Sequence, residues 1–336
     1  MELKDRKILV TGCAGFIGSH MTDRLLTRGN TVVGIDNFST GEKSFLERAC
    51  SDPNFELLEG DLLSMRLDTA VRGVDVLCHF AANPDVRIGA LDTAVHFRQN
   101  LEATYRLLEA ARRSGVKDVV FPSTSTVYGE PSVIPTPETY GPLVPISLYG
   151  SSKLGCEALI SGYCHTFDMN SVVYRFANVV GPRSTHNVLH DFVRKLRQNP
   201  KELEILGAEP GTSKSYVHIS DCLDGMIIGA ERAREQVEIF NIGSRDRITV
   251  KEIADVVVQE LELEKVRYRW TGGVKSGRGW VGDVRQMLLS IERLERLGWN
   301  PKCTSAEAIR AAVKEIAQED SAGAWVAMRT RKDLRQ

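Results

Sequence analysis

Short apolar runs alternate with amphipathic stretches through the first half of the chain. Six of these runs are rich in β-branched residues and lie between Gly, Asp, Asn or Ser residues: Lys7–Val10, Thr31–Ile35, Phe55–Leu58, Val74–Phe80, Asp118–Phe121 and Val172–Phe176. Such runs are typical of parallel strands that are buried on both faces. Between the fourth and fifth runs, apolar positions recur every three or four residues from Phe97 to Ala111, and Ser114-Gly115 ends this predicted helix. Strands that alternate with helices predict an α/β fold with a doubly wound parallel sheet.

The second half of the chain contains more loop. Gly181–His190 shows little periodicity, and residues 271–283 contain five glycines. Thr304-Ser305-Ala306-Glu307 is a capping-box pattern that predicts the start of an Ala-rich helix. The 336 residues suffice for one large or two modest domains. The predicted division is a first domain of residues 1–176 plus 217–242, a smaller C-terminal α/β domain of residues 177–216 plus 243–320, and a tail of residues 321–336.

The charge balance indicates the kind of partner, and the cysteine content indicates the redox compartment. The chain has 43 basic and 44 acidic side chains, so we expect no nucleic-acid or membrane partner and predict a small-molecule one. The seven cysteines contain no CxxC pair, which suits a reducing cytosol better than a disulfide framework or a zinc site. No apolar run approaches the ~18 residues of a membrane span. A cytoplasmic location is therefore expected.

A glycine-rich loop directly follows the first predicted strand. Gly12, Gly15 and Gly18 lie in it, and a predicted helix, Ser19–Arg28, comes next. Glycines there allow a sharp turn, close approach of backbone N–H groups to a pyrophosphate, and tight packing of helix on strand; the helix N-terminus attracts negative charge. The loop therefore predicts dinucleotide binding. A tight strand–helix turn without a ligand is the alternative interpretation.

Residues at the ends of other strands extend this predicted crevice. Asp36 ends the second strand, where a carboxylate can accept hydrogen bonds from the adenosine ribose and would repel a 2′-phosphate, so NAD is predicted in preference to NADP. The alternative is that Asp36 only caps the turn after it. Asp61-Leu62 and Phe80-Ala81-Ala82 follow or end the next two strands. The two alanines could equally be small core residues.

One of the eight tyrosines, Tyr149, has a lysine four residues later, Lys153. On a helix this spacing puts both side chains on one face. A nearby ammonium lowers the pKa of a phenol from about 10, so Tyr149 is predicted to act as a general base. Thr124, after the fifth strand, is the hydroxyl predicted to reach the same substrate oxygen. An exposed Ser/Thr turn beside a chance YxxxK is the alternative, which the glycine loop earlier in the chain disfavours.

Six motifs together resemble one enzyme superfamily. They are TGxxGFIGSH from Thr11, DNFSTG from Asp36, HFAA from His79, PSTSTVYG from Pro122, YGSSK from Tyr149 and RxxNVVGPR from Arg175. This set resembles the extended short-chain dehydrogenase/reductases, and among them the UDP-glucose 4-epimerases and other enzymes that modify UDP-sugars. The resemblance covers roughly residues 6 to 315. It implies a Rossmann-type domain that holds NAD tightly, a smaller C-terminal domain that holds a nucleotide sugar, and a Thr–Tyr–Lys triad between them.

The resemblance also implies the residues that contact the cofactor. Lys153 would bind the nicotinamide ribose, and Phe176 would lie beside the nicotinamide. Together with the glycine loop, the predicted cofactor-binding set is Gly12, Gly15, Phe16, Ile17, Gly18, Asp36, Asn37, Ser39, Thr40, Gly41, Asp61, Leu62, Phe80, Ala81, Ala82, Asn100, Ser123, Tyr149, Lys153 and Phe176. The triad would consist of Thr124, Tyr149 and Lys153.

The resemblance narrows the reaction as well. Related dehydratases carry an Asp-Glu pair immediately after the catalytic threonine, and related decarboxylases carry Glu at the second of these places; this chain has Ser125-Thr126. We therefore predict a UDP-hexose 4-epimerase that interconverts UDP-glucose and UDP-galactose through a 4-keto intermediate, with bound NAD recycled. The alternatives are an epimerase of UDP-N-acetylhexosamine or UDP-glucuronate, a nucleotide-sugar 4,6-dehydratase or decarboxylase, and an NAD-sensing module without activity.

The substrate side of the site matches the family less closely. Lys214 stands where relatives have arginine, and an ammonium lacks the planar fork that makes two hydrogen bonds to a diphosphate. Leu206 takes a place that is often aromatic, so weaker stacking on uracil is expected. A solvated loop position is the alternative for Arg278. The predicted substrate-binding set is Thr124, Tyr149, Asn178, Asn187, Val188, Leu206, Lys214, Tyr216, Arg278 and Asp283.

Some conspicuous residues receive no role. His186 and His190 have the spacing of metal ligands on a helix, but their segment lacks a helical pattern, so no metal site is expected. Cys13 is interpreted as a small tolerated residue and His79 as a packed one. Finally, the resemblance implies a homodimer formed by helices around residues 91–113 and 149–167.

Overall fold

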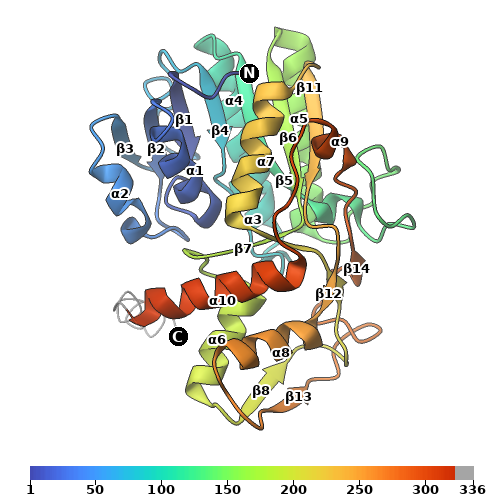
Figure 1. Ribbon diagram of the computed structural model, residues 1–336. Coiled ribbons are helices and arrows are strands. Elements are labelled where there is room, and N and C mark those ends of the chain that lie inside the picture. Colours follow the sequence, from blue (N-terminus) through green and yellow to red (C-terminus); the bar gives the residue numbers. More distant parts are fainter. Residues whose placement is uncertain (322–336) are drawn as a thin grey trace.

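Seven parallel strands form the central sheet of the computed structural model, which describes residues 1–321 (Figure 1). In order across the sheet they are β11 (Val237–Ile242), β6 (Asn170–Phe176), β5 (Asp118–Thr124), β4 (Val76–His79), β1 (Lys7–Thr11), β2 (Thr31–Asp36) and β3 (Phe55–Glu59). Each of the six predicted strands is present, and β11 is the additional one. Because the chain winds outward from β1 in both directions, the sheet is doubly wound as predicted, and a crevice is expected beyond the carboxyl ends of β1 and β4.

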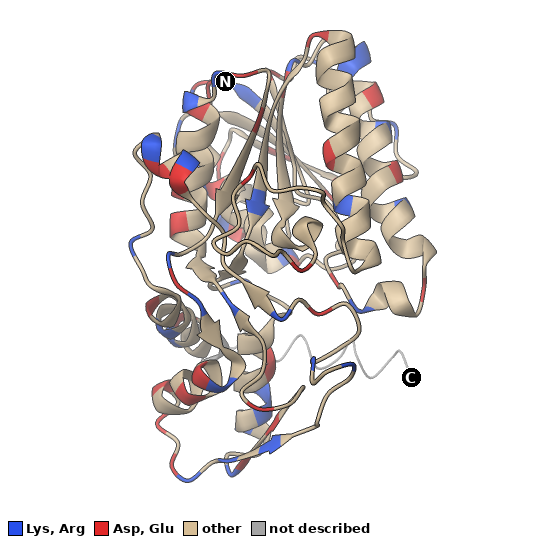
Figure 2. Ribbon diagram, turned by 90° about the vertical axis from the view of Figure 1, so that its right-hand side faces the viewer, with Lys and Arg blue, Asp and Glu red and all other residues tan. Residues whose placement is uncertain are grey.

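Helices cover both faces of the sheet (Figure 2). Alternate side chains of a strand point to opposite faces, so Val172 and Tyr174 pack in one apolar core and Val173 in the other. The first core includes residues of α1 (Phe16–Leu26), α2 (Glu47–Cys50), α7 (Ile219–Arg232) and α9 (Glu292–Arg296). The second includes residues of α4 (Ala103–Arg113) and α5 (Leu148–Phe167). Lys and Arg are scattered among Asp and Glu over the face shown in Figure 2.

The helix predicted from Phe97 to Ala111 is present but changes its winding. It consists of α3 (Ala94–His96), a π-helical turn η3 (Phe97–Glu102) and α4. Phe97 is 58% exposed instead of buried, whereas Thr104, Leu108 and Ala111 are buried as predicted. A π turn bonds residue i to i+5, so it rotates the residues before it relative to those after it. The constant period assumed from the sequence therefore placed Phe97 on the wrong face.

A smaller part lies below the sheet and has its own apolar core (Figure 1). Its helices are α6 (Val188–Gln198), α8 (Val250–Glu260) and α10 (Ser305–Ser321). Its short strands are β7 (Asn178–Val180), β8 (Glu202–Ile205), β9 (Ser213–Lys214), β10 (Tyr216–His218), β12 (Ile248–Thr249), β13 (Arg267–Trp270) and β14 (Gln286–Met287). The remaining short turns are η1 (Lys43–Leu46), η2 (Ile88–Ala90) and η4 (Ser125–Tyr128).

Two features of this smaller part bear on the sequence predictions. The capping box before α10 is confirmed, since Thr304 N donates to Glu307 (2.8 Å) and Glu307 N donates to Thr304 Oγ1 (3.3 Å). Helix α6, in contrast, begins at Val188, inside the segment that showed little periodicity.

The predicted tail lies outside the described residues apart from Ser321. Among the described helices, none is both long enough and apolar enough to cross a membrane.

Alanine substitutions at two helical glycines distinguish the close packing of the glycine loop from the effect of helix propensity on stability. A Cβ at Gly18 would lie 2.0 Å from the backbone oxygen of Gly12, whereas a Cβ at Gly162 in α5 would meet nothing within 4 Å. We expect Gly18→Ala to destabilise the fold by about 1–3 kcal/mol through overpacking. Gly162→Ala, the control, should stabilise it by up to about 1 kcal/mol because alanine favours helix. Urea denaturation measures both, and equal effects would contradict the packing argument.

Candidate active site

The glycine loop lies between β1, β4 and α1 at the predicted crevice. Gly12 has φ of 69°, and a Cβ there would lie 2.6 Å from the backbone nitrogen of Ala81. Helix α1 begins at Phe16, three residues before the predicted start, so Phe16, Ile17 and Gly18 form its first turn. Backbone N–H groups of a first turn have no partner within the helix, and no side chain caps α1. The loop therefore presents free donors and a helix N-terminus, which fits a dinucleotide pyrophosphate.

Asp36 caps the turn that follows β2, which is one of the two interpretations of its position. Its carboxylate accepts hydrogen bonds from the backbone nitrogens of Ala14 and Phe38, each at 2.8 Å, so it does cap the turn. Burial raises the pKa of Asp36, and these backbone hydrogen bonds oppose the rise. Asn37 Nδ2 donates to Asp61 at 2.8 Å, which joins the ends of β2 and β3. A contact with the ribose remains a prediction for Asp36.

The segment after β4 continues the crevice. Phe80, Ala81 and Ala82 are only partly buried, which favours a lining position for the two alanines over a core position. Asn100 lies in the π turn and is 1% exposed. Its Oδ1 accepts from Asn83 N (2.7 Å), and its Nδ2 donates to Ser152 Oγ on α5 (3.0 Å). Asn100 thus joins the segment after the alanines to the helix that carries Tyr149.

Tyr149 lies beside Thr124, and Lys153 lies one turn further along α5, with its Nζ atom over the ring of Phe121 in β5. Thr124 is the last residue of β5, and Tyr149 and Lys153 lie in the first turns of α5, whose N-cap Ser147 accepts a hydrogen bond from Gly150 N (3.1 Å). A hydrogen bond joins Tyr149 to Thr124. Thr124 Oγ1 also accepts from Thr126 N at 3.2 Å, which fixes the hydroxyl at the strand end. The chance-motif interpretation would not require Tyr149 to lie beside Thr124.

The protonation of this pair differs from the sequence prediction. Burial raises the pKa of Tyr149 to about 12, although the hydrogen bond with Thr124 opposes the rise. Burial also lowers the pKa of Lys153 to about 8, and the Nζ atom lies 4.0 Å from the centroid of the Phe121 ring. Burial thus shifts both pKa values in the direction that favours the neutral forms, opposite to the lowering of the tyrosine pKa that the sequence predicted.

Ser123 and Phe176 lie behind the triad. The Ser123 hydroxyl donates to Glu157, which forms a buried ion pair with Arg175 (Nη2 to Oε2, 2.7 Å). Phe176 is 7% exposed and stacks on Tyr174 with ring centroids 6.4 Å apart. This buried network was not predicted from the sequence. The Ser123 hydroxyl donates its proton to Glu157, so its oxygen can contact a cofactor only as a hydrogen-bond acceptor while this bond is kept.

Several predicted substrate residues gather around the glycine-rich segment 271–283. Lys214 Nζ lies 2.6 Å from Asp283 Oδ1, and Asp283 Oδ2 accepts from Gly279 N (3.3 Å). Burial raises the pKa of Tyr216, and the nearby charge of Asp283 adds to the rise. Arg278 is no solvated loop residue, because its Nη2 lies 2.8 Å from Glu130 Oε1 and its side chain is 19% exposed. Glu130, which the sequence did not single out, connects this segment to the loop after Thr124.

Asn178 and Asn187 have structural partners. Asn178 Nδ2 donates to the carbonyl oxygen of Ser215 (3.1 Å), which supports the β7–β10 pair. Asn187 is the N-cap of α6, and its Oδ1 accepts from His190 N (2.9 Å). Val188 is the first residue of that helix, so its backbone N–H has no intrahelical partner.

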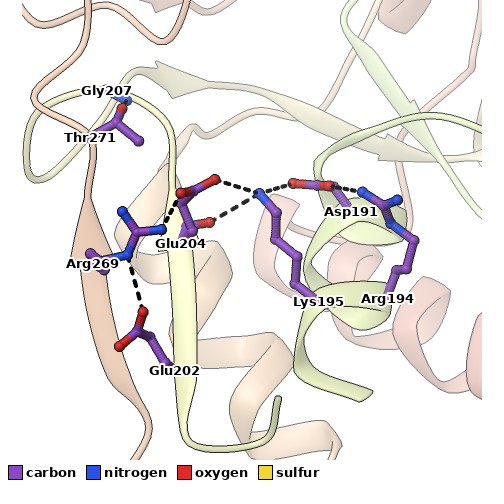
Figure 3. Close-up of polar contacts among 8 residues, drawn as sticks. All are labelled: Asp191, Arg194, Lys195, Glu202, Glu204, Gly207, Arg269 and Thr271. Atoms are coloured by element: carbon purple, nitrogen blue, oxygen red, sulfur yellow. Dashed lines mark hydrogen bonds and ion pairs between the residues drawn. The ribbon is translucent and has the colours of Figure 1, made fainter. Parts of the chain in front are cut away.

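Leu206 directly follows β8, which pairs with β13. Figure 3 shows the ion pairs and hydrogen bonds around these two strands. Lys195 of α6 contacts Asp191 (2.7 Å) and the backbone oxygen of Glu204 in β8 (3.2 Å). Arg269 of β13 pairs with Glu204 and with Glu202, the latter at 3.0 Å. Thr271 Oγ1 then accepts from Gly207 N at 3.0 Å. These contacts tie α6, β8 and β13 together just before the residues predicted to meet the substrate.

The residues without an assigned role are placed as follows. His79 is buried between Thr11 (2.7 Å) and Thr104 (2.9 Å), and burial lowers its pKa to about 3. Cys13 is fully buried, and burial raises its thiol pKa, so it lacks the thiolate that reagents attack. Within the described residues, no group of three or more His, Cys, Asp or Glu is placed to hold a metal ion.

The burial of Lys153 should make the folded protein less stable than it would be with an uncharged side chain at this position. The pKa of Lys153 is about 8 in the folded protein against an ordinary 10.5. Below pH 8 the lysine is charged in the folded state too, and burial of this charge lowers the free energy of unfolding. Lys153→Met should raise the melting temperature of the nucleotide-free protein at pH 7 while abolishing activity. The advantage should shrink between pH 8 and 10.5, the window in which wild type gains stability. Thermal unfolding across this range, with exposed Lys43→Met as the control, measures the effect; a pH-independent difference would contradict it.

Known proteins resemble the chain along most of its length. A family model described as the NAD dependent epimerase/dehydratase family matches residues 8–243. A crystal structure of a UDP-galactose 4-epimerase is 40% identical, with a TM-score of 0.82 over 93% of this chain and 99% of that one. The UDP-glucose 4-epimerase of Mycolicibacterium smegmatis is 30% identical over 92% of this chain and 97% of its own length.

Other relatives carry out different reactions. UDP-glucuronic acid decarboxylase 2 of Arabidopsis thaliana is 30% identical over 95% of this chain and 70% of its own length. Similarity therefore establishes the family and its cofactor, while the reaction has to be argued from the site. The chain belongs to the NAD-dependent epimerase/dehydratase family, with the Rossmann-type sheet and the NAD dependence that the sequence predicted.

Proposed function

We propose that the protein is an NAD-dependent UDP-hexose 4-epimerase that interconverts UDP-glucose and UDP-galactose. The observation that carries this proposal is the position of Tyr149 beside Thr124, with Lys153 one turn along the same helix and no carboxylate at positions 125 and 126. Thr126 Oγ1 lies 3.2 Å from Thr124 Oγ1, so a neutral hydroxyl stands there. A hydroxyl cannot supply the acid and base that loss of water requires. Oxidation and re-reduction at C4 need no carboxylate at positions 125 and 126.

We propose the following roles for residues of the chain. Tyr149 takes the proton of the sugar 4-hydroxyl and later returns it, and Thr124 holds the phenol oxygen through their hydrogen bond. Lys153, with a pKa near 8, is mostly protonated at pH 7 and favours the phenolate once the site is closed to water. Bound NAD supplies the acceptor and donor of the C4 hydride. Returning the hydride to the other face of the 4-keto sugar gives the epimer, with no net consumption of cofactor.

We propose the predicted division of labour between the two parts of the chain. Residues 1–176 with 217–242 would hold NAD, and residues 177–216 with 243–320 would hold the nucleotide sugar. Separate apolar cores support this division. One stretch crosses it, because Ile291, Leu294 and Trp299 pack in the core of the sheet.

We also propose the homodimer. Large apolar side chains are exposed along the helices implied in it: Leu91, Phe97 (58%), Tyr105 (49%), Leu148 and Phe167. Four-helix packing between two copies would cover this row, since exposed apolar side chains that cluster on one surface mark an interaction site.

The proposed reaction is tested with purified protein and UDP-galactose, followed by NMR of the sugar protons. Wild type should form UDP-glucose without releasing CO2 or losing water. Tyr149→Phe should retain NAD but lose at least about 10²-fold in turnover, the usual size of a general-base contribution. Tyr163→Phe, on the same helix but hydrogen-bonded to Glu109, is the matched control and should keep its activity.

Two outcomes would contradict this proposal. Near-normal turnover of Tyr149→Phe would remove the assigned base. Unchanged UDP-galactose and UDP-glucose, with conversion of UDP-glucuronate instead, would assign the site to one of the other reactions found among the relatives.

The proposed dimer is tested by placing a charged side chain in the proposed contact surface. Phe97→Asp should shift the protein from dimer to monomer, because a carboxylate buried between two copies has no partner. Val281→Asp replaces an equally exposed apolar residue away from these helices and should leave the mass unchanged. Light scattering after gel filtration measures both, and a dimeric Phe97→Asp protein would refute the proposed surface.

A further inference from the structure

Two buried N–H donors in the glycine-rich segment 271–283 have no hydrogen-bond acceptor. They are Arg278 Nε and Trp280 Nε1, and few side-chain atoms in the described part of the chain share this condition. A buried donor without an acceptor costs about 1–3 kcal/mol. Two such donors two residues apart suggest a surface built for an acceptor that the folded chain does not itself provide.

These donors belong to the predicted substrate cluster. Lys214 Nζ lies 5.4 Å from the centroid of the Trp280 ring and 2.6 Å from Asp283 Oδ1. Asp283 N donates to the carbonyl oxygen of Trp280 at 3.2 Å. The indole, the ammonium and the carboxylate therefore form one compact group, with Arg278 two residues before Trp280 along the chain.

The two cations of this group are already engaged. Lys214 pairs with Asp283, and Arg278 pairs through Nη2 with Glu130 at 2.8 Å. Their formal charges cancel, so an incoming diphosphate meets no surplus of positive charge. The bonds still available are the unused protons of Lys214, the Arg278 Nε–H and the Trp280 N–H. Phosphate oxygens only accept hydrogen bonds, which matches a group of donors without free acceptors.

We propose that Trp280 binds the substrate by donating its indole N–H to a diphosphate oxygen of the nucleotide sugar. This inference rests on the proposed function, in that it takes a nucleoside diphosphate sugar as the ligand. Arg278 Nε–H and the Lys214 ammonium bind the same diphosphate. The indole N–H thereby supplies a donor where Lys214 lacks the second arm of an arginine fork.

Trp280→Phe keeps the ring and removes the donor. Isothermal titration should show UDP binding weakened about 10-fold or more, as expected for a hydrogen bond to a charged group. Uridine, which lacks the diphosphate, should bind wild type and variant alike. In turnover of UDP-galactose, KM should rise with kcat within about 2-fold, because the contact is made equally before and during the reaction. Trp270→Phe, the same change on β13, is the matched control and should leave all of these values unchanged.

A second variant guards against a merely structural effect. Arg278→Lys keeps the charge but removes Nε–H, and it should likewise weaken UDP more than uridine. UDP affinity unchanged in a folded Trp280→Phe protein would overturn the inference, as would an equal loss for uridine. The inference and the proposed function can fail separately. If wild type epimerises no UDP-hexose but Trp280→Phe weakens UDP binding, the diphosphate contact stands and the epimerase proposal falls; if wild type is active and UDP affinity is unchanged, the reverse holds.

Discussion

The close contact between Gly12 and the backbone of Phe80 and Ala81 determines how the rest of the crevice is arranged. There is no room for a Cβ at Gly12, and none at Gly18, which packs on the Gly12 carbonyl. Because the loop can come this near, the ends of β1 and β4 and the start of α1 meet at one place. The free N–H groups of α1 then lie beside the alanines that line the crevice. A single methyl group at either glycine would separate these elements.

A chain of hydrogen bonds extends this contact to α5, the helix that carries Tyr149 and Lys153. Thr104 Oγ1 donates to Asn100 O (2.7 Å), so it accepts from His79 Nε2, and His79 Nδ1 accepts from Thr11. Burial holds the pKa of His79 near 3, which keeps the ring neutral and this order of donors intact. Asn100 then reaches Ser152, the neighbour of Lys153. Thr11, next to the glycine loop, is thereby connected to the helix that carries the proposed catalytic residues.

The sequence was informative where local pattern governs the structure. Apolar runs located the strands, the glycine spacing located the turn between β1 and α1, and Tyr149 and Lys153 lie on one helix as their spacing predicted. It failed where structure depends on contacts between distant segments. The π turn moved Phe97 out of the core, and burial of Tyr149 reversed the expected direction of its pKa shift. No spacing links Glu130 to Arg278, or Lys214 to Asp283, because only the fold brings them together.

The charge balance of the chain, a net −1, has a local counterpart in the site. Lys214 and Arg278 are each neutralised by a carboxylate, and the pyrophosphate loop contributes no basic side chain between Gly12 and Gly18. Both anionic parts of the proposed ligands would therefore be held mainly by oriented N–H groups rather than by surplus positive charge. Such donors act over short distances and in fixed directions, so they select for the shape of the anion as well as its charge. A site built this way can distinguish a nucleotide sugar from other anions while the protein as a whole stays close to neutral.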